Sequence, residues 1–487
     1  MGATAVCAAL AGCSGGGSSD ATGSRGWSAA GLDVVSKAEI RDGIAAVTAL
    51  RPDGALETDT FDLARGKRLW ARPATMLGRT PDQGVQPPAM PGRFVATVEP
   101  EGRGVPEGRS RAEGHGEVEG HSGPEGRAEA EDRGAREGRA GAEGPSGAEG
   151  RGGADGRGGV LVARDARTGV LLWTRDVQGT FGPQACGPML CLTERTGGKD
   201  TRFVALDPSA DGRELWRMDG VAEVEWADAS RVVVLRMTRH PSLEAHDLRG
   251  GGTLWTFPVE AAVGNGVDLS GGWAFGSLGA SIVGYIGPDQ GERGQAPASF
   301  GFFSVRLADG VLVWRRPRRL RVYPSASPAV GLITRSVTAD GGDGGFERLD
   351  PATGRTSATV PADRAPRSAW SLSLSSDMTR IGFLTPDRPG RAVALDNAAP
   401  VQARGLRTWS FCAVRPSALK ITGQPGFYPT APLCGYDLGS GRRLADPGPP
   451  PGWYTGSTDG WRVWRDESGT LHALHDAKGT SPGMYGP

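Results

Sequence analysis

The chain has 487 residues, and its 55 Lys and Arg residues are balanced by 55 Asp and Glu residues. A formal net charge of zero at pH 7 provides no overall basic field, which argues against nucleic acid as a partner. The 78 glycines and 36 prolines predict many turns between short strands, together with unstructured sequence.

The N-terminal sequence MGATAVCAALAGCSGGGSS contains a short apolar stretch, the tetrapeptide LAGC ending at Cys13, and a Gly/Ser run. This pattern resembles the lipobox of bacterial lipoproteins, in which the cysteine is acylated and becomes the mature N-terminus. The resemblance implies a signal peptide and lipobox over residues 1–13, a lipid (palmitate) on Cys13, and a flexible tether over residues 14–30. No Lys or Arg precedes the apolar stretch, so we expect the natural start to lie further upstream. The alternative is a cysteine placed by chance in an unstructured N-terminus.

A motif of Asp, then Gly, then Trp recurs along the rest of the chain at intervals of about forty residues. The clearest copy is ARDARTGVLLW, residues 163–173. Its complete copies are Asp62, Gly66 and Trp70; Asp165, Gly169 and Trp173; Asp207, Gly212 and Trp216; and Asp247, Gly251 and Trp255. The partial copies are Gly310 and Trp314 after Arg306, Asp350 and Gly354, Asp437 and Gly441, and remnants at Asp396 and Asp476. Self-similarity at a fixed period predicts a repeat fold.

Each copy of the motif predicts a β-hairpin. The residues before the Asp alternate or run apolar, as in RFVALD, which indicates a strand. The Asp side chain accepts hydrogen bonds from the turn amides, and the Gly takes the positive φ that closes the turn. The Trp ends the returning strand, where its apolar ring is placed to wedge against the next sheet. A further apolar run precedes each hairpin, so each unit has about four strands, as a β-propeller blade does.

The pattern A-x-D-x-x-T-G-x-x-x-W resembles the tryptophan-docking repeat of the PQQ-like (quinoprotein-type) β-propellers, and degenerate copies cover residues 45–480. The resemblance implies an all-β propeller over residues 31–480, followed by a tail over 481–487. We expect about eight four-stranded blades, with seven as the alternative. The first and last copies are fragments, so we expect an N-terminal segment to complete the final blade.

Residues 101–158 interrupt the series of repeats. The segment consists mainly of Glu, Gly, Arg and Ala and has few bulky apolar side chains. Such a stretch does not bury enough apolar surface to offset the entropy lost on ordering. We therefore predict a disordered loop inserted within a blade hairpin. The alternative is a mixed-charge segment that binds the cell wall or a partner surface.

Four cysteines follow the predicted lipobox: Cys186, Cys191, Cys412 and Cys434. They allow three disulfide pairings. The pairs 186–191 and 412–434 are favoured because each lies within one predicted structural unit, and both bonds require an oxidising compartment. The alternative is four buried free thiols. No histidine lies at ligand spacing from either pair, which disfavours a zinc site.

No catalytic, cofactor-binding or metal-binding residue is assigned from the sequence. Enzymes of the quinoprotein type hold PQQ and calcium with acidic and Asn side chains, often beside a disulfide between adjacent cysteines. This chain has no adjacent cysteines and no recognisable cluster of such ligands. His472 and His475 lie three residues apart on a predicted strand, so they point to opposite faces. The basic segment 314–322 is interpreted as a solvated connection between blades; the alternative is a patch that faces an acidic polymer or phospholipid.

Two functions remain as hypotheses. The first is a non-catalytic binding or scaffolding lipoprotein, lipid-anchored on the extracytoplasmic face of the cell membrane, similar in fold to propeller lipoproteins of envelope assembly. We expect it to be a monomer without a cofactor, bound to an unknown protein or envelope partner and not to nucleic acid. The alternative is a PQQ-dependent dehydrogenase, or a degenerate relative, that acts in the propeller funnel. Three or more acidic or amide side chains converging at the narrow end of the funnel would favour the enzyme.

Overall fold

The computed structural model of the chain describes residues 25–76, 85–100, 159–195, 201–288, 299–321, 332–338 and 342–363. It also describes the shorter segments 371–374, 380–385, 388–394, 399–403, 407–411, 417–419, 428–430, 433–445, 455–458, 460–466 and 468–475. All of them belong to one compact unit, which comprises residues 1–101 and 156–487. The predicted lipobox, most of the tether, the insertion, Asp396, Cys412 and Asp476 lie outside the described residues.

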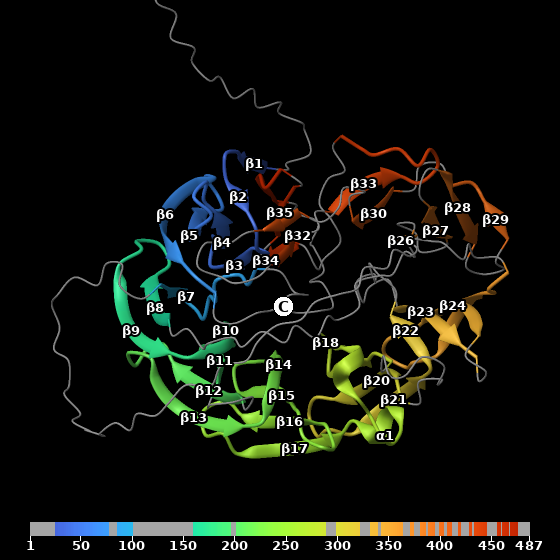
Figure 1. Cartoon of the computed structure of the whole chain (residues 1–487), viewed down its shortest axis with the longest axis horizontal. Coiled ribbons are helices and arrows are strands. Elements are labelled where there is room, and N and C mark those ends of the chain that lie inside the picture. The colour runs from blue at the N-terminus through green and yellow to red at the C-terminus, as the bar shows by residue number, and fades with distance from the viewer. Residues whose placement is uncertain are drawn as a thin grey trace, which may run out of the picture. The chain divides into compact units, whose positions relative to one another are not determined.

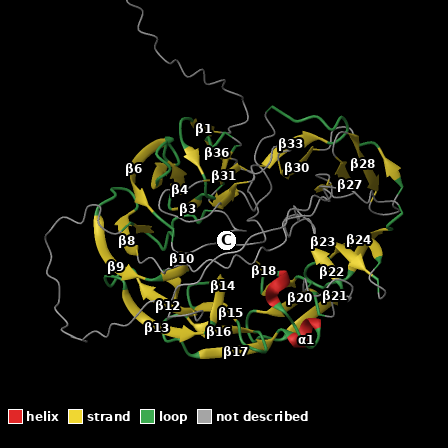
Figure 2. Ribbon diagram, viewed as in Figure 1, coloured by secondary structure: helices red, strands yellow, loops and turns green. Residues whose placement is uncertain are grey.

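The described residues form antiparallel β-sheets almost throughout (Figures 1 and 2). The first sheet contains β2 (Asp33–Val34), β3 (Glu39–Arg41), β4 (Ile44–Leu50), β5 (Leu56–Asp62) and β6 (Lys67–Ala74). The next contains β7 (Phe94–Glu99), β8 (Gly159–Asp165) and β9 (Leu171–Val177). Two four-stranded sheets follow: β10 (Gly179–Cys186), β11 (Met189–Arg195), β12 (Thr201–Asp207) and β13 (Arg213–Asp219); then β14 (Val221–Ala227), β15 (Arg231–Arg236), β16 (Ser242–Asp247) and β17 (Thr253–Pro258).

Three more four-stranded sheets continue the series in chain order. They are β18 (Trp273–Leu278), β19 (Ser281–Ile286), β20 (Gly301–Arg306) and β21 (Leu312–Pro317); β22 (Arg319–Arg321), β23 (Leu332–Val337), β24 (Asp343–Leu349) and β25 (Thr356–Val360); and β26 (Ser371–Leu374), β27 (Arg380–Thr385), β28 (Arg388–Ala394) and β29 (Pro400–Val401). The short helix α1 (Glu260–Val263) and a 3₁₀ turn at Leu269–Gly271 lie between β17 and β18. No described helix combines the length and apolar character needed to span a bilayer.

The chain's first described strand completes its last sheet. β1 (Arg25–Ala29) pairs antiparallel with β36 (Leu471–His475), beside β35 (Trp461–Arg465) and β34 (Thr455–Thr458). This pairing confirms that an N-terminal segment completes the final blade. It also corrects the predicted tether over 14–30, because residues 25–29 are strand and not a flexible linker.

The number of sheets agrees with about eight blades. The described residues form six four-stranded sheets, one of five strands and one of three. Two further pairs, β30 (Arg407–Phe411) with β33 (Leu433–Asp437) and β31 (Ser417–Leu419) with β32 (Tyr428–Thr430), lie before the closing sheet. The β30–β33 pair ends at the repeat turn of Asp437, so it is a ninth repeat unit, of which two strands are paired in the described residues.

The core lies between the faces of successive sheets. Leu243 and Trp255 from the β14–β17 sheet pack in one cluster with Phe275 and Phe303 from the β18–β21 sheet. A second cluster joins the β7–β9 and β10–β13 sheets, and a third joins β10–β13 to β14–β17. Four-stranded antiparallel sheets that follow one another in sequence, pack face to face and close with the first strand constitute a β-propeller.

Candidate functional site

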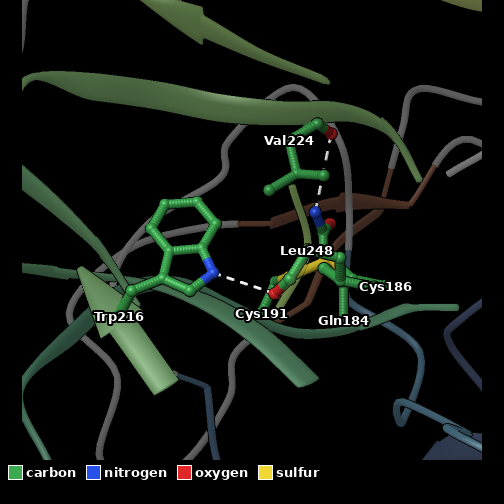
Figure 3. The surroundings of a disulfide bond; sticks show 6 residues. All are labelled: Gln184, Cys186, Cys191, Trp216, Val224 and Leu248. Atoms are coloured by element: carbon green, nitrogen blue, oxygen red, sulfur yellow. Dashed lines mark hydrogen bonds between the residues drawn. A yellow bond between two sulfur atoms is a disulfide. The ribbon is translucent and has the colours of Figure 1, made fainter. Parts of the chain in front are cut away.

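Six tryptophans on strands at the outer edge of their sheets dock on the turn of the next sheet. In each case the indole Nε1–H donates to the carbonyl of the residue that follows the Asp position of the motif. The bonds run from Trp27 to Leu63 (2.7 Å), Trp70 to Ala166 (2.9 Å), Trp173 to Pro208 (2.8 Å), Trp216 to Leu248 (2.8 Å; Figure 3), Trp255 to Leu307 (2.9 Å) and Trp314 to Pro351 (2.9 Å). These bonds assign the motif Trp to the seams between blades.

The motif glycine is required for two independent reasons. Gly169 has a φ of +70°, which favours glycine. In addition, a Cβ at Gly169 would lie 2.7 Å from the Trp70 ring, and a Cβ at Gly354 would lie 2.6 Å from the Trp314 ring. The same approach of a tryptophan from the preceding sheet occurs at Gly66, Gly212, Gly251 and Gly310. The sequence predicted the backbone reason, and the structure adds the docked ring.

The motif aspartate organises the turn. Asp165 Oδ1 accepts hydrogen bonds from the backbone N–H groups of Arg167 and Thr168 and from the Thr168 hydroxyl. Burial alone would raise the pKa of Asp165, but the hydrogen bonds from Thr168 and Arg167 outweigh it and lower the pKa below its usual value. The other motif aspartates accept hydrogen bonds from backbone N–H groups of their own turns: Asp62, Asp207, Asp247, Asp350 and Asp437.

The copy with Arg306 in place of Asp keeps the turn by a different contact. Arg306 donates from Nε and Nη2 to the carboxylate of Asp309, three residues later, at 2.8 and 2.7 Å. Asp309 Oδ1 also accepts from the N–H of Val311. The Gly310 N–H still donates to the carbonyl of Arg306, as in the other copies. Docking of Trp255 on this turn is therefore retained without the motif Asp.

The seam made by Trp27 was missed in the sequence. Its motif is split between the two ends of the chain, because Trp27 lies on β1 while the strand before it in the sheet is β36. A search for Asp, Gly and Trp in consecutive order does not detect a copy of this kind. The signal that could have found it is the expectation of closure, combined with a lone Trp in the short sequence RGWSA.

One of the two predicted disulfides is present. Cys186 and Cys191 are joined where β10 turns into β11, and both are fully buried (Figure 3). Gln184, two residues before Cys186, donates from Nε2 to the Val224 carbonyl at 3.5 Å and so links β10 to β14. Cys434 is disulfide-bonded, and its predicted partner, Cys412, lies outside the described residues.

The described residues contain neither a disulfide between adjacent cysteines nor a group of three acidic or histidine ligands like those expected of the quinoprotein enzymes. The disulfide joins cysteines five residues apart and is buried in the cluster between the β10–β13 and β14–β17 sheets. Within the described part of the chain, no three His, Cys, Asp or Glu side chains come together as metal ligands. Glu225 on β14 is one of the described carboxylates whose pKa is raised. Burial raises its pKa, the neighbouring Glu223 raises it further, and a hydrogen bond from Trp273 opposes the rise.

A Ser–His–Asp hydrogen-bond chain lies on the closing sheet. Asp466 Oδ2 and His472 Nε2 are 2.8 Å apart, and His472 Nδ1 lies 2.9 Å from the hydroxyl oxygen of Ser28. Trp464 stacks on the His472 ring, whereas His475 contacts Trp461. Ser28 lies directly opposite His472 in the strand pairing, on an exposed part of the sheet. The chain of hydrogen bonds therefore connects the closing strand to the last blade.

The last strands of three sheets expose apolar side chains to solvent. We call the last strand of each sheet its outer strand; in the described residues, no other strand pairs with the free edge of β9, β17 or β21. The exposed side chains are Val170 (58%), Leu171 (37%) and Leu172 (38%) at β9, Leu254 (52%) on β17, and Val311 (49%) and Val313 (47%) at β21. An exposed apolar edge is a template for main-chain pairing with another chain.

The basic segment 314–322 is more ordered than a solvated connection. Residues 314–317 belong to the outer strand β21, and residues 319–321 form β22, the first strand of the next sheet. Only Arg318, with a φ of +56°, connects the two strands. The segment does connect two successive sheets, as the sequence interpretation expected, but its described residues other than Arg318 lie on strands and not in a loop.

No protein-family model and no curated protein sequence matches the chain. Among solved structures, BamB from Moraxella catarrhalis is similar over 91% of this chain and 100% of its own, at 11% identity and a TM-score of 0.40. Quinohemoprotein alcohol dehydrogenase from Comamonas testosteroni is similar over 93% of this chain and 76% of its own, at 12% identity and a TM-score of 0.38. Sqt1 from Saccharomyces cerevisiae is similar over 91% of this chain and 95% of its own, at 7% identity and a TM-score of 0.38.

Proposed function

We propose that this chain is a non-catalytic β-propeller that binds a protein partner through its outer strands. The observation that carries the proposal is the set of exposed apolar side chains at the free edges of β9, β17 and β21. A buried apolar side chain contributes about 1.5–3 kcal/mol, so a partner that covers several of them gains affinity, in addition to the main-chain hydrogen bonds of an edge strand.

The proposed location is the extracytoplasmic face of a membrane, with the lipid on Cys13 as the anchor. The lipobox-like sequence supports this, and the Cys186–Cys191 disulfide is in keeping with an oxidising compartment. The test is metabolic labelling with a palmitate analogue in the natural host. Labelled protein should pellet with membranes, and the Cys13→Ala variant should carry no label. Equal labelling of that variant would overturn the anchor assignment.

The binding proposal is tested by site-specific photocrosslinking in cells. A photoreactive amino acid replaces Leu254 on β17 in one strain and Leu172 on β9 in another. The matched control places it at Arg65, whose side chain is 79% exposed on a turn of the first sheet. We expect discrete products of higher mass from one or both outer-strand positions and none from the control. Products from all three positions alike, or from none, would contradict a partner surface on the outer strands.

The PQQ-dependent dehydrogenase is tested separately by calorimetric titration of the full chain with PQQ in the presence of calcium. Our proposal expects no saturable heat of binding. Tight one-to-one binding would replace the scaffold proposal with the enzyme and direct attention to the carboxylates of β14.

A further inference from the structure

The outer strand β21 differs from the other exposed outer strands in its charge. Val311 and Val313 are exposed at its start, Arg315 and Arg316 lie towards its end, and Arg318 directly follows it; we call these three arginines the cations of β21. By contrast, β17 has the sequence TLWTFP and carries no charge. On β9, the one cation, Arg175, forms an ion pair with Glu214 of the next sheet at 3.0 Å. Among these strands, only β21 combines exposed apolar residues with several cations.

The cations of β21 have no carboxylate partner among the described residues. Arg315 Nη1 donates to the Ala261 carbonyl at 3.1 Å, and Arg316 Nε donates to the Gly354 carbonyl. The arginines on either side of these two are neutralised: Arg306 pairs with Asp309, and Arg319 pairs with Glu347 at 2.9 Å. The positive charge is therefore concentrated at one end of β21 and is available to an anionic group.

The backbone edge of the same strand is positioned to accept another strand. The N–H of Arg318 donates to the carbonyl of Phe300 at 2.9 Å. In an antiparallel pair, every second residue forms backbone hydrogen bonds with the partner strand. The next residue of β21 that bonds to β20 is therefore Arg316, opposite Phe302. The N–H and C=O of Arg315 therefore point away from the sheet. Pro317 falls on this outward row, where a proline removes no hydrogen bond of the sheet.

We infer that the β21 edge receives an extended acidic–apolar peptide segment of a protein partner by strand addition. The outward N–H and C=O groups pair with the peptide backbone. Apolar residues at alternate peptide positions contact Val311 and Val313, and Asp or Glu residues beyond them lie beside Arg315 and Arg318. The expected pattern in the peptide is apolar-x-apolar-x-acidic. This inference rests on the proposed binding function and adds to it the chemistry of the partner segment.

The test uses the full chain and the fluorescent peptide TVTVTETE, followed by fluorescence anisotropy at low salt. Two control peptides separate the contributions. In the first, alternate backbone amides are N-methylated, which keeps every side chain but blocks strand pairing. In the second, lysine replaces both glutamates. We expect saturable binding of the parent peptide and no binding of the N-methylated peptide. The lysine peptide should bind at least about tenfold more weakly than the parent.

The matched protein variants are Arg315→Gln on β21 and Arg72→Gln on β6, another exposed arginine on an outer strand. Arg315→Gln should weaken binding of the parent peptide about fivefold, the upper range for an exposed ion pair, and Arg72→Gln should leave it unchanged. Thermal unfolding of both variants checks that the fold is retained. Equal effects of the two substitutions, or undiminished binding of the N-methylated peptide, would overturn the inference.

A separate experiment with vesicles that contain anionic lipid tests whether the cations of β21 bind a membrane instead of a peptide. Binding of the full chain to these vesicles that depends on Arg315, without binding of the peptide, would assign the cations to a membrane surface and overturn the inference. The proposed function fails on a different result, namely the absence of crosslinks from the outer strands in cells. Crosslinks from Leu254 or Leu172 together with no peptide binding would leave the proposed function intact and reject only the β21 segment.

Discussion

Two glycines share the same positive φ, but only one of them lies against a docked tryptophan. Comparing an alanine substitution at each separates the stability lost through backbone strain from the stability lost by displacing the ring. Gly92 and Gly169 both have a φ of +70°, but a Cβ at Gly92 would meet nothing within 4 Å, whereas at Gly169 it would meet the Trp70 ring at 2.7 Å. We expect Gly92→Ala to reduce the free energy of unfolding by about 1–2 kcal/mol. Gly169→Ala must also displace Trp70 and should cost about 3–5 kcal/mol, as removal of a large core side chain does. Chemical denaturation measures both; equal losses would show that the ring does not depend on the glycine.

The titration of a single buried side chain, Asp59, is expected to make the stability of the fold depend on pH. The side chain is fully buried, and Oδ1 forms an ion pair with Arg68. Burial raises its pKa to about 6, despite the opposing charge of Arg68. A pKa that is higher in the folded state than in the unfolded state contributes stability below the unfolded value of 3.8, and this contribution is lost as the pH rises through about 6. The change corresponds to about 3 kcal/mol.

The variant Asp59→Asn removes this titration while keeping the size of the side chain. Arg68 retains its ion pair with Glu57 at 2.8 Å. We expect the variant to be at least as stable as the parent at pH 7, with a flatter dependence of the free energy of unfolding between pH 4 and pH 6. Denaturant titrations at several pH values measure the slope. A large loss of stability at pH 7 would show instead that the charged pair is net stabilising.

At the scale of elements, the closing strand β1 combines a docked tryptophan with an exposed hydrogen bond. Trp27 donates to Leu63 of the first sheet and stacks on Phe61, while Ser28 bonds to His472 of the last sheet. We expect Trp27→Ala to cost about 3–5 kcal/mol, although changes near a terminus are usually tolerated. Ser28→Ala on the same strand should cost about 1 kcal/mol. A near-neutral result for Trp27→Ala in denaturant titrations would mean that closure does not depend on this ring.

The sequence predicted the repeated hairpins well because their requirements are local. An Asp that bonds to its own turn, a Gly with positive φ and an apolar strand are all visible within about ten residues. Pairings between segments far apart in the chain leave no such motif within a short stretch of sequence. Trp27 docks on a turn 36 residues away, and its strand pairs with the far end of the chain, so the tether predicted over 14–30 wrongly included the strand 25–29. The sequence already marks the basic segment 314–322, but only the strand pairing shows that the backbone of Arg315 faces outward, and no described carboxylate neutralises this residue.

At the scale of the whole molecule, the insertion of residues 101–158 is predicted to be separable from the fold. The strands on either side of it are already paired, with Glu99 opposite Val160 and Phe94 opposite Asp165. The chain therefore leaves and re-enters the unit at adjacent positions, and a short Gly-rich turn of a few residues would close the β7–β8 hairpin. Loop-closure entropy favours the shorter connection slightly, because the cost grows with the logarithm of loop length.

Replacing residues 101–158 by such a turn should leave the thermal unfolding midpoint unchanged or slightly raised. Calorimetry of the parent and the deletion variant measures this difference. The control is a variant of equal length in which the segment is replaced by a Gly/Ser sequence, which tests composition without shortening the loop. A large fall in the midpoint for both variants would show that the segment contacts the propeller. A fall for the shortened variant alone would show that the β7–β8 hairpin requires a long connection.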